Sequence, residues 1–162
     1  MKRLILLRHG KSSWNHNVQD VDRPLEKRAY NDAELIAEDF NKKTDYNFTL
    51  WSSKANRAKT TAELVSNTLI SRIDDFKIKD EFYTFDVNEL LLLIKNLPNT
   101  VENMMLVGHN PAYTQIINYF CQEEVIDNLP TTGLAELEFQ ADNWSEIKKA
   151  TLNLLLFPKH IR

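Results

Sequence analysis

Histidine and arginine side chains follow three apolar runs of the sequence, each near the point where the run ends. Arg8 and His9 follow the first run directly. Arg57 comes shortly after the second run, in the first turn of an expected helix, and His109 follows a later run. Parallel strands of an open α/β sheet present their carboxyl ends to one crevice, so we expect these side chains to lie together. Guanidinium groups bind anions and a neutral imidazole can attack an electrophile, which predicts an anion site with a histidine nucleophile.

The elements that must position these residues alternate along the chain. Apolar runs typical of buried strands lie at 4–7, 48–51, 76–78 and 103–107. Helical spacing of apolar residues lies at 24–40, 55–69, 87–97 and 111–120. This alternation predicts an α/β fold, a three-layer α/β/α sandwich with a mostly parallel central sheet. We interpret 134–139 and 151–157 as two edge strands that run antiparallel.

Length and composition limit the classes of protein. With 162 residues, 43% of them apolar, the chain has the size of one domain, which we expect over 1–162. A net charge of -3 favours neither a nucleic acid nor an anionic membrane as partner, so an anion site must be local. Cys121 is the single cysteine, which suits a cytoplasmic protein. The run 4–7 is too short for a signal peptide or a membrane span.

Each of these residues also has an ordinary structural interpretation. A histidine after a strand often caps or packs, Arg57 alone would be a solvated helix residue, and Ser52-Ser53 alone would cap a helix. The functional hypothesis depends on their convergence from separate strands. His16 and His160 have no identifiable partner, and we interpret them as surface residues.

A metal site is the main competitor for a pair of histidines. No carboxylate lies at ligand spacing from His9 or His109. Arg8 and Arg57 would also repel a divalent ion, so we expect no metal and no cofactor. The sequence has neither a Gly-rich phosphate loop nor a GxGxxG turn, which disfavours a nucleotide site.

Three motifs in order resemble the histidine phosphatase superfamily, the relatives of the cofactor-dependent phosphoglycerate mutases. They are Arg8-His9-Gly10, Ser52-Ser53 with Arg57 and Thr61-Ala62-Glu63, and Gly108-His109-Asn110-Pro111. Further segments are similar to the short SixA-type phosphohistidine phosphatases, namely Arg23-Pro24-Leu25, Val107-Gly108-His109-Asn110-Pro111 and Leu129-Pro130-Thr131-Thr132-Gly133. The resemblance runs from residue 3 to about 158. The family usually has a proline where this chain has Lys54, so the path of the loop before Arg57 stays open.

The resemblance implies a role for each matching residue. His9 would be the nucleophile that becomes a phosphohistidine. Arg8, Arg57 and His109 would form the catalytic phosphate pocket around it. Further phosphate-binding positions implied by the resemblance are Ser12, Asn15 and Arg23.

A leaving group that departs as an alkoxide needs a proton. Asp20 and Asp22, in the loop before Arg23, lie where the short branch places an acid, and Glu81 lies roughly where mutase-like members keep theirs. Each of the three carboxylates is equally consistent with a solvated residue. A phosphohistidine substrate lessens the need for an acid, because imidazole leaves more easily than an alkoxide.

The short segment from Leu69 to Asn103 bears on the substrate. It has room for one strand and one helix, so the capping insert of larger relatives is absent and the pocket should be open. An open pocket admits a phosphorylated side chain of a protein. The sequence therefore predicts a metal-independent phosphatase that works through phosphohistidine at His9 on a phosphoprotein, with phosphohistidine as the expected group. The alternatives are a phosphatase of small phosphorylated metabolites and a non-catalytic phosphate-binding module.

Overall fold

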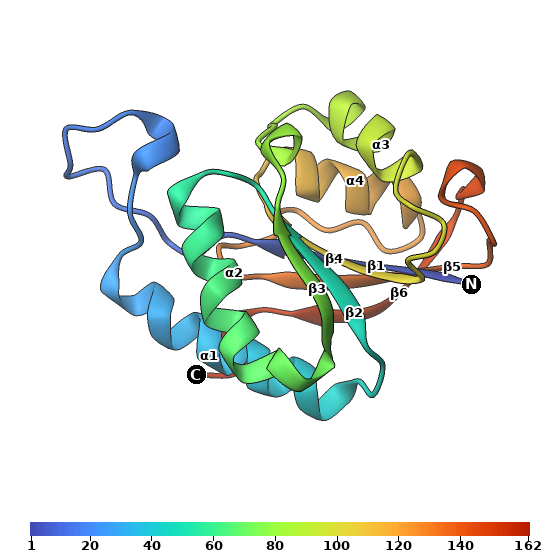
Figure 1. Cartoon of the computed structure of the whole chain (residues 1–162), viewed down its shortest axis with the longest axis horizontal. Coiled ribbons are helices and arrows are strands. Elements are labelled where there is room, and N and C mark those ends of the chain that lie inside the picture. Colours follow the sequence, from blue (N-terminus) through green and yellow to red (C-terminus); the bar gives the residue numbers. More distant parts are fainter.

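The computed structural model describes residues 1–162 and contains one six-stranded sheet. Its strands are β1 (Lys2–Arg8), β2 (Phe48–Ser52), β3 (Ile73–Ile78), β4 (Asn103–Gly108), β5 (Leu134–Phe139) and β6 (Ala150–Leu156). Their order across the sheet is β3-β2-β4-β1-β5-β6. Neighbours from β3 to β1 pair in parallel, whereas β5 is antiparallel to both β1 and β6. The predicted, mostly parallel sheet is confirmed (Figure 1).

Four helices cover the two faces of this sheet. They are α1 (Lys27–Lys43), α2 (Asn56–Leu69), α3 (Val87–Lys95) and α4 (Ala112–Phe120). Helices α1 and α2 pack together on one face, and α3 and α4 pack together on the other (Figure 1). The three-layer α/β/α sandwich expected from the sequence is therefore confirmed.

The apolar core divides along β1 into two halves. Leu4 and Leu6 belong to the core beneath α3 and α4, whereas Ile5 and Leu7 belong to the core beneath α1 and α2. All four side chains are fully buried. Successive residues of a strand point to opposite faces, so a sheet covered on both faces requires an uninterrupted apolar run. That requirement explains why the sequence before Arg8 is continuously apolar.

The last two strands differ from expectation. We expected both to be edge strands, but β5 lies between β1 and β6, and the edges are β3 and β6. The side chain of Glu136, in the middle of β5, is buried. Its carboxylate accepts a hydrogen bond from the hydroxyl of Tyr46, and this partner compensates the burial of a polar group within an internal strand.

Two element boundaries also differ from expectation. Helix α1 begins at Lys27 rather than at Pro24, because Leu25 forms a β-bridge with Ser12 before the helix starts. Strand β3 begins at Ile73 rather than at Phe76. As an edge strand it is only partly covered, so its first residues lack the apolar run that marks a buried strand.

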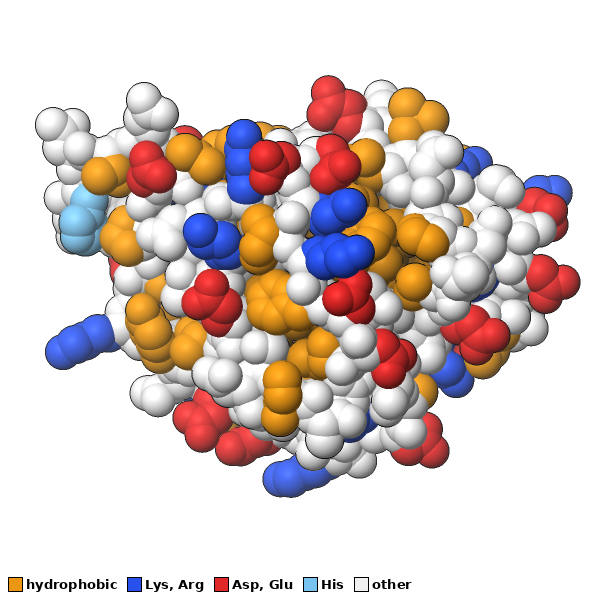
Figure 2. All heavy atoms as spheres, in the orientation of Figure 1, with side chains coloured by type: hydrophobic (Ala, Val, Ile, Leu, Met, Phe, Trp, Pro, Cys, Tyr) orange, Lys and Arg blue, Asp and Glu red, His pale blue; other side chains and the backbone are white.

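The carboxyl ends of β1, β2 and β4 meet at one edge of the sheet (Figure 1). The segment between β1 and α1, which contains the short 3-10 helix η1 (Asp20–Asp22), extends beyond this edge at the upper left of Figure 1. Acidic and basic side chains are interspersed over the face shown in Figure 2, as the small net charge of -3 leads one to expect. No helix is long and apolar enough to cross a membrane.

Candidate active site

The four residues expected to converge do lie together at this edge. The Nε atom of Arg57, in the first turn of α2, is 3.3 Å from Nε2 of His9, in the loop after β1. The ring centroids of His9 and His109 are 5.3 Å apart. Arg8 is the last residue of β1 and directly precedes His9. Arg57 and His109 are 1% and 0% exposed, which excludes the solvated-helix interpretation of Arg57.

Backbone contacts from three elements hold the loop that carries His9. The N–H of His9 donates to the carbonyl of Gly108 at the end of β4. The N–H of Thr132, in the turn before β5, donates to the carbonyl of His9. The N–H of Gly10 donates to Oγ1 of Thr61 on α2 at 2.9 Å. Because these contacts come from elements of the packed core, they hold the backbone that carries the imidazole in a fixed position.

Two glycines of the motifs are required by close approach. A Cβ at Gly10 would lie 2.8 Å from Cβ of Ala29 on α1. A Cβ at Gly108 would lie 2.5 Å from the hydroxyl oxygen of Tyr113 on α4. Neither glycine has a positive φ. These positions therefore need glycine because a helix packs directly against the loop, and not because the backbone is left-handed.

Two hydrogen bonds select the same tautomer of His9. Its Nδ1 lies 2.7 Å from the carbonyl oxygen of Gly10, which can only accept, so Nδ1 carries the proton. Nε of Arg57 can only donate, so Nε2 of His9 carries the lone pair. The nitrogen that faces the guanidinium groups is therefore the nucleophilic one.

Both histidines are neutral at neutral pH. Burial lowers the pKa of His9 to about 3, and the charges of Arg57 and Arg8 add to this effect against the opposing hydrogen bond to Gly10. Burial also lowers the pKa of His109 to about 2, with further lowering by His9 and Arg57. Since an imidazole attacks only through an unprotonated nitrogen, this environment keeps His9 ready as a nucleophile.

His109 lies in a buried pocket of mixed character. Its Nε2 is 2.7 Å from Oγ of Ser53, in the loop after β2. The rings of Tyr83 and Phe85 lie 5.4 and 4.9 Å from its ring centroid. The other ring nitrogen, Nδ1, is buried and has no hydrogen-bond partner. One ring nitrogen thus has a hydrogen-bond partner in the protein, and the other has none.

Two further arginines complete the cationic cluster. Arg8 donates from Nη1 to the carbonyl of Leu129 at 2.9 Å, whereas its buried Nε has no partner. Arg23 is buried and donates from Nη1 to Oγ of Ser12 at 2.6 Å. Its guanidinium also lies 3.6 Å above the ring centroid of Trp14, a cation–π contact that orients it. Ser12 therefore acts on Arg23 rather than facing the histidines directly.

Asp20 is the one predicted acid that the structure brings to the site. Its carboxylate accepts hydrogen bonds from Nη2 of Arg57 at 3.0 Å, Nε of Arg23 at 3.2 Å and the hydroxyl of Tyr83 at 2.5 Å. Partial burial alone would raise the pKa of Asp20, but the hydrogen bonds from Tyr83 and Arg57 outweigh it and hold the pKa at about 2. The carboxylate is therefore ionised and spans two guanidinium groups.

Three other predicted residues lie away from the cluster. Asp22 is exposed. Its backbone carbonyl accepts a hydrogen bond from the side chain of Asn56 on α2, but its carboxylate forms no hydrogen bond with that helix. Glu81 is exposed and lines a shallow hollow beside α3. Asn15 is exposed and its side chain makes no hydrogen bond, so the asparagine of the motif does not reach the histidines.

Tyr83 is a site residue that the sequence did not reveal. It lies two positions beyond Glu81, just after the short 3-10 helix η3 (Asp80–Phe82), and it contacts both Asp20 and His109. The position after β3 was correctly associated with the site, but the residue type we sought there was an acid. An aromatic residue following an edge strand gives no such signal, because tyrosine is common in loops and cores alike.

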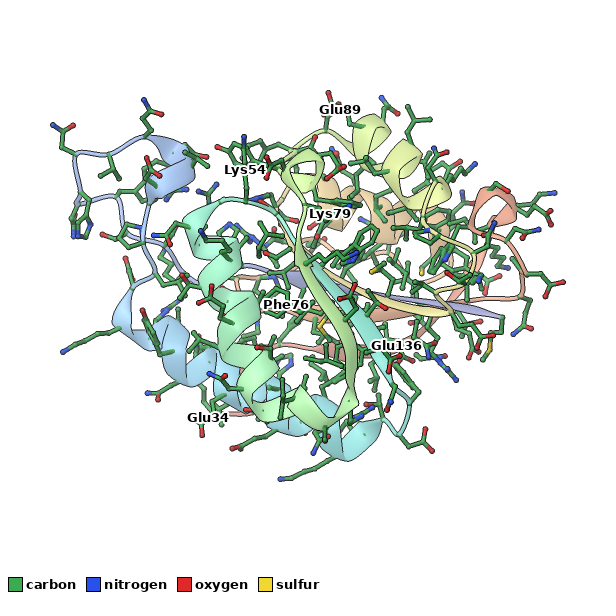
Figure 3. All side chains as sticks on the ribbon, viewed as in Figure 1. Glu34, Lys54, Phe76, Lys79, Glu89 and Glu136 are labelled. Carbon is green, nitrogen blue, oxygen red and sulfur yellow. The ribbon has the colours of Figure 1, made fainter.

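The loop without the family's proline still delivers Arg57 to the cluster. The N–H of Ala55 donates to Oγ of Ser53, and the N–H of Ala58 donates to the carbonyl of Ala55, which starts α2. Lys54 is exposed on this loop, with its Nζ 5.8 Å from the ring centroid of Tyr83 (Figure 3). Hydrogen bonds thus replace the rigidity that a proline would give.

No group of three or more histidine, cysteine, aspartate or glutamate residues is placed to hold a metal ion. The nearest donor atoms to the two histidines are guanidinium nitrogens and a serine hydroxyl. The donor set at this edge is therefore suited to an anion.

Comparison with known proteins agrees with this geometry. The model of the histidine phosphatase superfamily (branch 1) matches residues 4–81, the part of the chain that holds Arg8, His9, Arg23 and Arg57. A solved structure from Agrobacterium tumefaciens, assigned as the phosphohistidine phosphatase SixA, is 28% identical in sequence and has a TM-score of 0.81. The match covers 97% of this chain and 98% of that one. The chain is thus similar to the histidine phosphatase superfamily both in these motif-bearing residues and in its fold.

Two more relatives extend the comparison. The protein histidine phosphatase SixA complexed with tungstate has the same fold, with 20% identity, a TM-score of 0.82 and 99% of each chain covered. An uncharacterised chloroplast protein of Arabidopsis thaliana is 26% identical over 158 residues, which is 90% of this chain and 70% of the plant protein. The phosphoglycerate mutase-like fold without a large insert is thus shared along nearly the whole length.

Proposed function

We propose that this histidine phosphatase removes a phosphoryl group from a phosphoprotein in two steps, with His9 as the nucleophile. The observation that carries this proposal is the neutral imidazole of His9, whose Nε2 lone pair lies 3.3 Å from Arg57 within a cluster of guanidinium groups. Nε2 attacks phosphorus, the N–P bond forms, and the bond to the leaving group breaks. Water then attacks phosphorus and breaks the N–P bond, which releases phosphate and restores His9.

The surrounding cations stabilise the transferring group. A phosphoryl group in transfer spreads negative charge over its equatorial oxygens, so positioned cations supply most of the catalysis. Arg8, Arg23 and Arg57 are the candidate donors, and the free Nε of Arg8 and Nδ1 of His109 have no partner within the protein. A bound phosphoryl group would supply the acceptors that these two atoms lack.

Phosphohistidine is the substrate group that fits this site best. Asp20 accepts three hydrogen bonds, and its pKa of about 2 leaves it without a proton to donate near neutral pH. An alkyl phosphate such as phosphoserine needs a strong acid for its leaving group, whereas the imidazole of phosphohistidine is a better leaving group. The chain also lacks a capping insert, so a side chain presented by a protein can reach His9.

A labelling experiment tests the nucleophile. Wild-type protein mixed with a ³²P-labelled aryl phosphate and quenched in base should retain label that is lost in acid, as expected for phosphate on a histidine nitrogen. His9→Ala should retain none and should turn over no substrate, while its melting temperature shows that it is folded. His16→Ala, which removes an exposed histidine of the following loop, is the matched control and should behave as wild type. Label on the His9→Ala protein would reject the assignment.

Substrate and metal are tested on the same preparation. A phosphohistidine-bearing protein should be hydrolysed faster than a phosphoserine peptide, and the reverse order would reject the substrate while leaving His9 as nucleophile. A chelator should leave the rate unchanged, since the proposed donors are guanidinium and imidazole groups. A rate lost to chelator and restored by Zn²⁺ or Mg²⁺ would reject the metal-independent mechanism.

A further inference from the structure

Ser53 occupies an unusual position for a serine next to a helix start. Its side chain is 0% exposed, and its Oγ lies 2.7 Å from Nε2 of His109. The same Oγ accepts a hydrogen bond from the N–H of Ala55 at 3.1 Å. It is therefore linked at once to the first turn of α2 and to the second histidine of the site.

The protons around Ser53 can be counted. A hydroxyl has one proton to donate, and Oγ of Ser53 already accepts from Ala55. His109 is the one remaining partner of this fully buried hydroxyl. If Nε2 of His109 carried a proton, the hydroxyl would accept twice and its own proton would be buried without an acceptor, which costs free energy. Both the hydroxyl and Nε2 are satisfied when Ser53 donates to Nε2, and the proton of the neutral imidazole then lies on Nδ1.

The remaining ring nitrogen of His109 has nothing to bind within the protein. Nδ1 is buried without a partner. The rings of Tyr83 and Phe85 pack against the imidazole, and neither residue forms a hydrogen bond with Nδ1. An N–H donor in such a place needs an acceptor from outside the chain, and the nearby guanidinium groups restrict that acceptor to an anion.

We propose that Ser53 is a positioning residue that fixes the tautomer of His109, so that Nδ1–H donates to an oxygen of the bound phosphoryl group. This inference rests on the proposed function for the identity of the ligand, but the tautomer itself is a property of the free protein. Ser53 touches neither substrate nor His9 and acts only through His109. The hydrogen bond from Ser53 thus orients the Nδ1–H donor of His109 before the substrate binds.

Nuclear magnetic resonance of the full chain labelled with ¹⁵N-histidine tests the tautomer directly. At pH 7 the long-range ¹H–¹⁵N spectrum should show His109 protonated at Nδ1, with its signals assigned by their loss in His109→Gln. Ser53→Ala should convert His109 into a mixture of both tautomers, and Ser53→Thr should restore the wild-type pattern because it keeps the hydroxyl. Ser52→Ala is the matched control, because Ser52 is equally buried but donates to a backbone carbonyl, and it should leave the pattern unchanged.

Binding and turnover provide the second readout. Titrated with inorganic phosphate, Ser53→Ala should bind on the order of tenfold more weakly than wild type, because only part of its His109 population keeps the correct proton. Its kcat with aryl phosphate should fall by roughly 10-fold to 100-fold, less than the loss of a whole preorganised donor, and Ser53→Thr should recover most of both losses.

Two outcomes would overturn the inference. Wild-type His109 protonated at Nε2 would do so without any variant, even if Ser53→Ala failed to fold. An unchanged His109 tautomer and unchanged phosphate affinity in folded Ser53→Ala would do so as well. Absence of turnover in the wild type would reject the proposed function instead, and the tautomer and phosphate measurements would still decide the role of Ser53.

Discussion

The two ends of the sheet bury similar residue types in opposite ways. At the amino ends of the strands lies a cluster formed by Arg3, Tyr46, Arg72, Glu136 and Glu138, which we name the amino-end cluster (Figure 3 labels Glu136). At the carboxyl ends lies the site cluster formed by Arg8, His9, Asp20, Arg23, Arg57 and His109. The amino-end cluster matches two arginines with two carboxylates, whereas the site cluster places one carboxylate among three arginines.

The two clusters differ more in how their polar atoms are hydrogen-bonded than in which residue types they contain. In the amino-end cluster the Tyr46 hydroxyl donates to Glu136, Arg3 pairs with Glu138 at 3.8 Å, and Arg72 donates to the carbonyl of Tyr46. None of the buried polar atoms without a partner belongs to this cluster. In the site cluster, Nε of Arg8 and Nδ1 of His109 are buried and unpartnered. Buried charge alone therefore does not mark function, whereas buried donors without acceptors among guanidinium groups fit an anion site.

Removal of Arg57 should give the largest effect and should change activity. If Arg57 binds the transferring phosphoryl group, Arg57→Ala should lower kcat by on the order of 10² to 10³, the scale for one preorganised donor. Arg57→Lys should recover only part of this loss, because lysine keeps the charge without the two-pronged geometry. Lys59→Ala, on the same helix, is the control and should keep wild-type turnover. Kinetics with aryl phosphate, measured beside thermal melts, test this role of Arg57. Wild-type turnover in Arg57→Ala would show that Arg57 does not bind the phosphoryl group.

The matching change in the amino-end cluster should alter stability and leave catalysis intact. Tyr46→Phe removes the hydrogen bond to the buried carboxylate of Glu136 and should lower the free energy of unfolding by about 1.5 to 3 kcal/mol. Its kcat should equal that of wild type. Tyr119→Phe, at a tyrosine that is 50% exposed, is the control and should change neither quantity. Urea unfolding and kinetics on one preparation test this, and a large drop in kcat for Tyr46→Phe would contradict the division between the clusters.

A lower pH should decrease the stability of the folded protein, because the histidines of the site cluster are held neutral. The folded pKa of His9 is about 3, against an ordinary value of 6.5. As the pH falls below 6.5, the unfolded chain takes up a proton that the folded chain does not, so stability declines from 6.5 downward. Between pH 7 and 5.5 this amounts to about 1.3 kcal/mol for one such histidine.

Urea unfolding at pH 7 and 5.5 measures this decline. Between pH 7 and 5.5, the free energy of unfolding of His9→Asn should fall less than that of wild type. The difference should be about the contribution of the one histidine removed. His160→Asn removes an exposed histidine and should decline as wild type does. An equal decline in wild type and His9→Asn would show that His9 is not held neutral by its surroundings.

Residues that directly follow buried strands were predictable from the sequence. Arg8, His9 and His109 stand at the ends of runs whose apolar character admits one interpretation, so their convergence follows from the parallel sheet. The sandwich itself follows from the same alternation. Arg57 lies a few residues beyond its strand, and the path of its loop depends on a hydrogen bond from Ala55 to Ser53 that no pattern reveals.

Contacts between distant loops were not predictable. Asp20 and Tyr83 are 63 positions apart, and their hydrogen bond depends on how the loop after β1 folds back over the sheet. That contact brings Asp20, and neither Asp22 nor Glu81, to the cluster, and the sequence alone left all three positions open. The burial of Glu136 could not be predicted for the same reason, because its partner Tyr46 is 90 positions away. Polar residues that find buried partners break the periodic pattern from which exposure is inferred.

The reversed direction of β5 determines which neighbouring segment can change along with the site. In the parallel strands, the loop that follows each strand lies at the edge with the histidines. In β5 it is the turn before the strand that lies there, where Thr132 donates to the carbonyl of His9 and Leu129 accepts from Arg8. The hairpin between β5 and β6 lies at the far edge. Substitutions in 140–149 should therefore leave the active site unchanged. Substitutions in 129–133 are constrained, because this turn holds Arg8 and His9 in place.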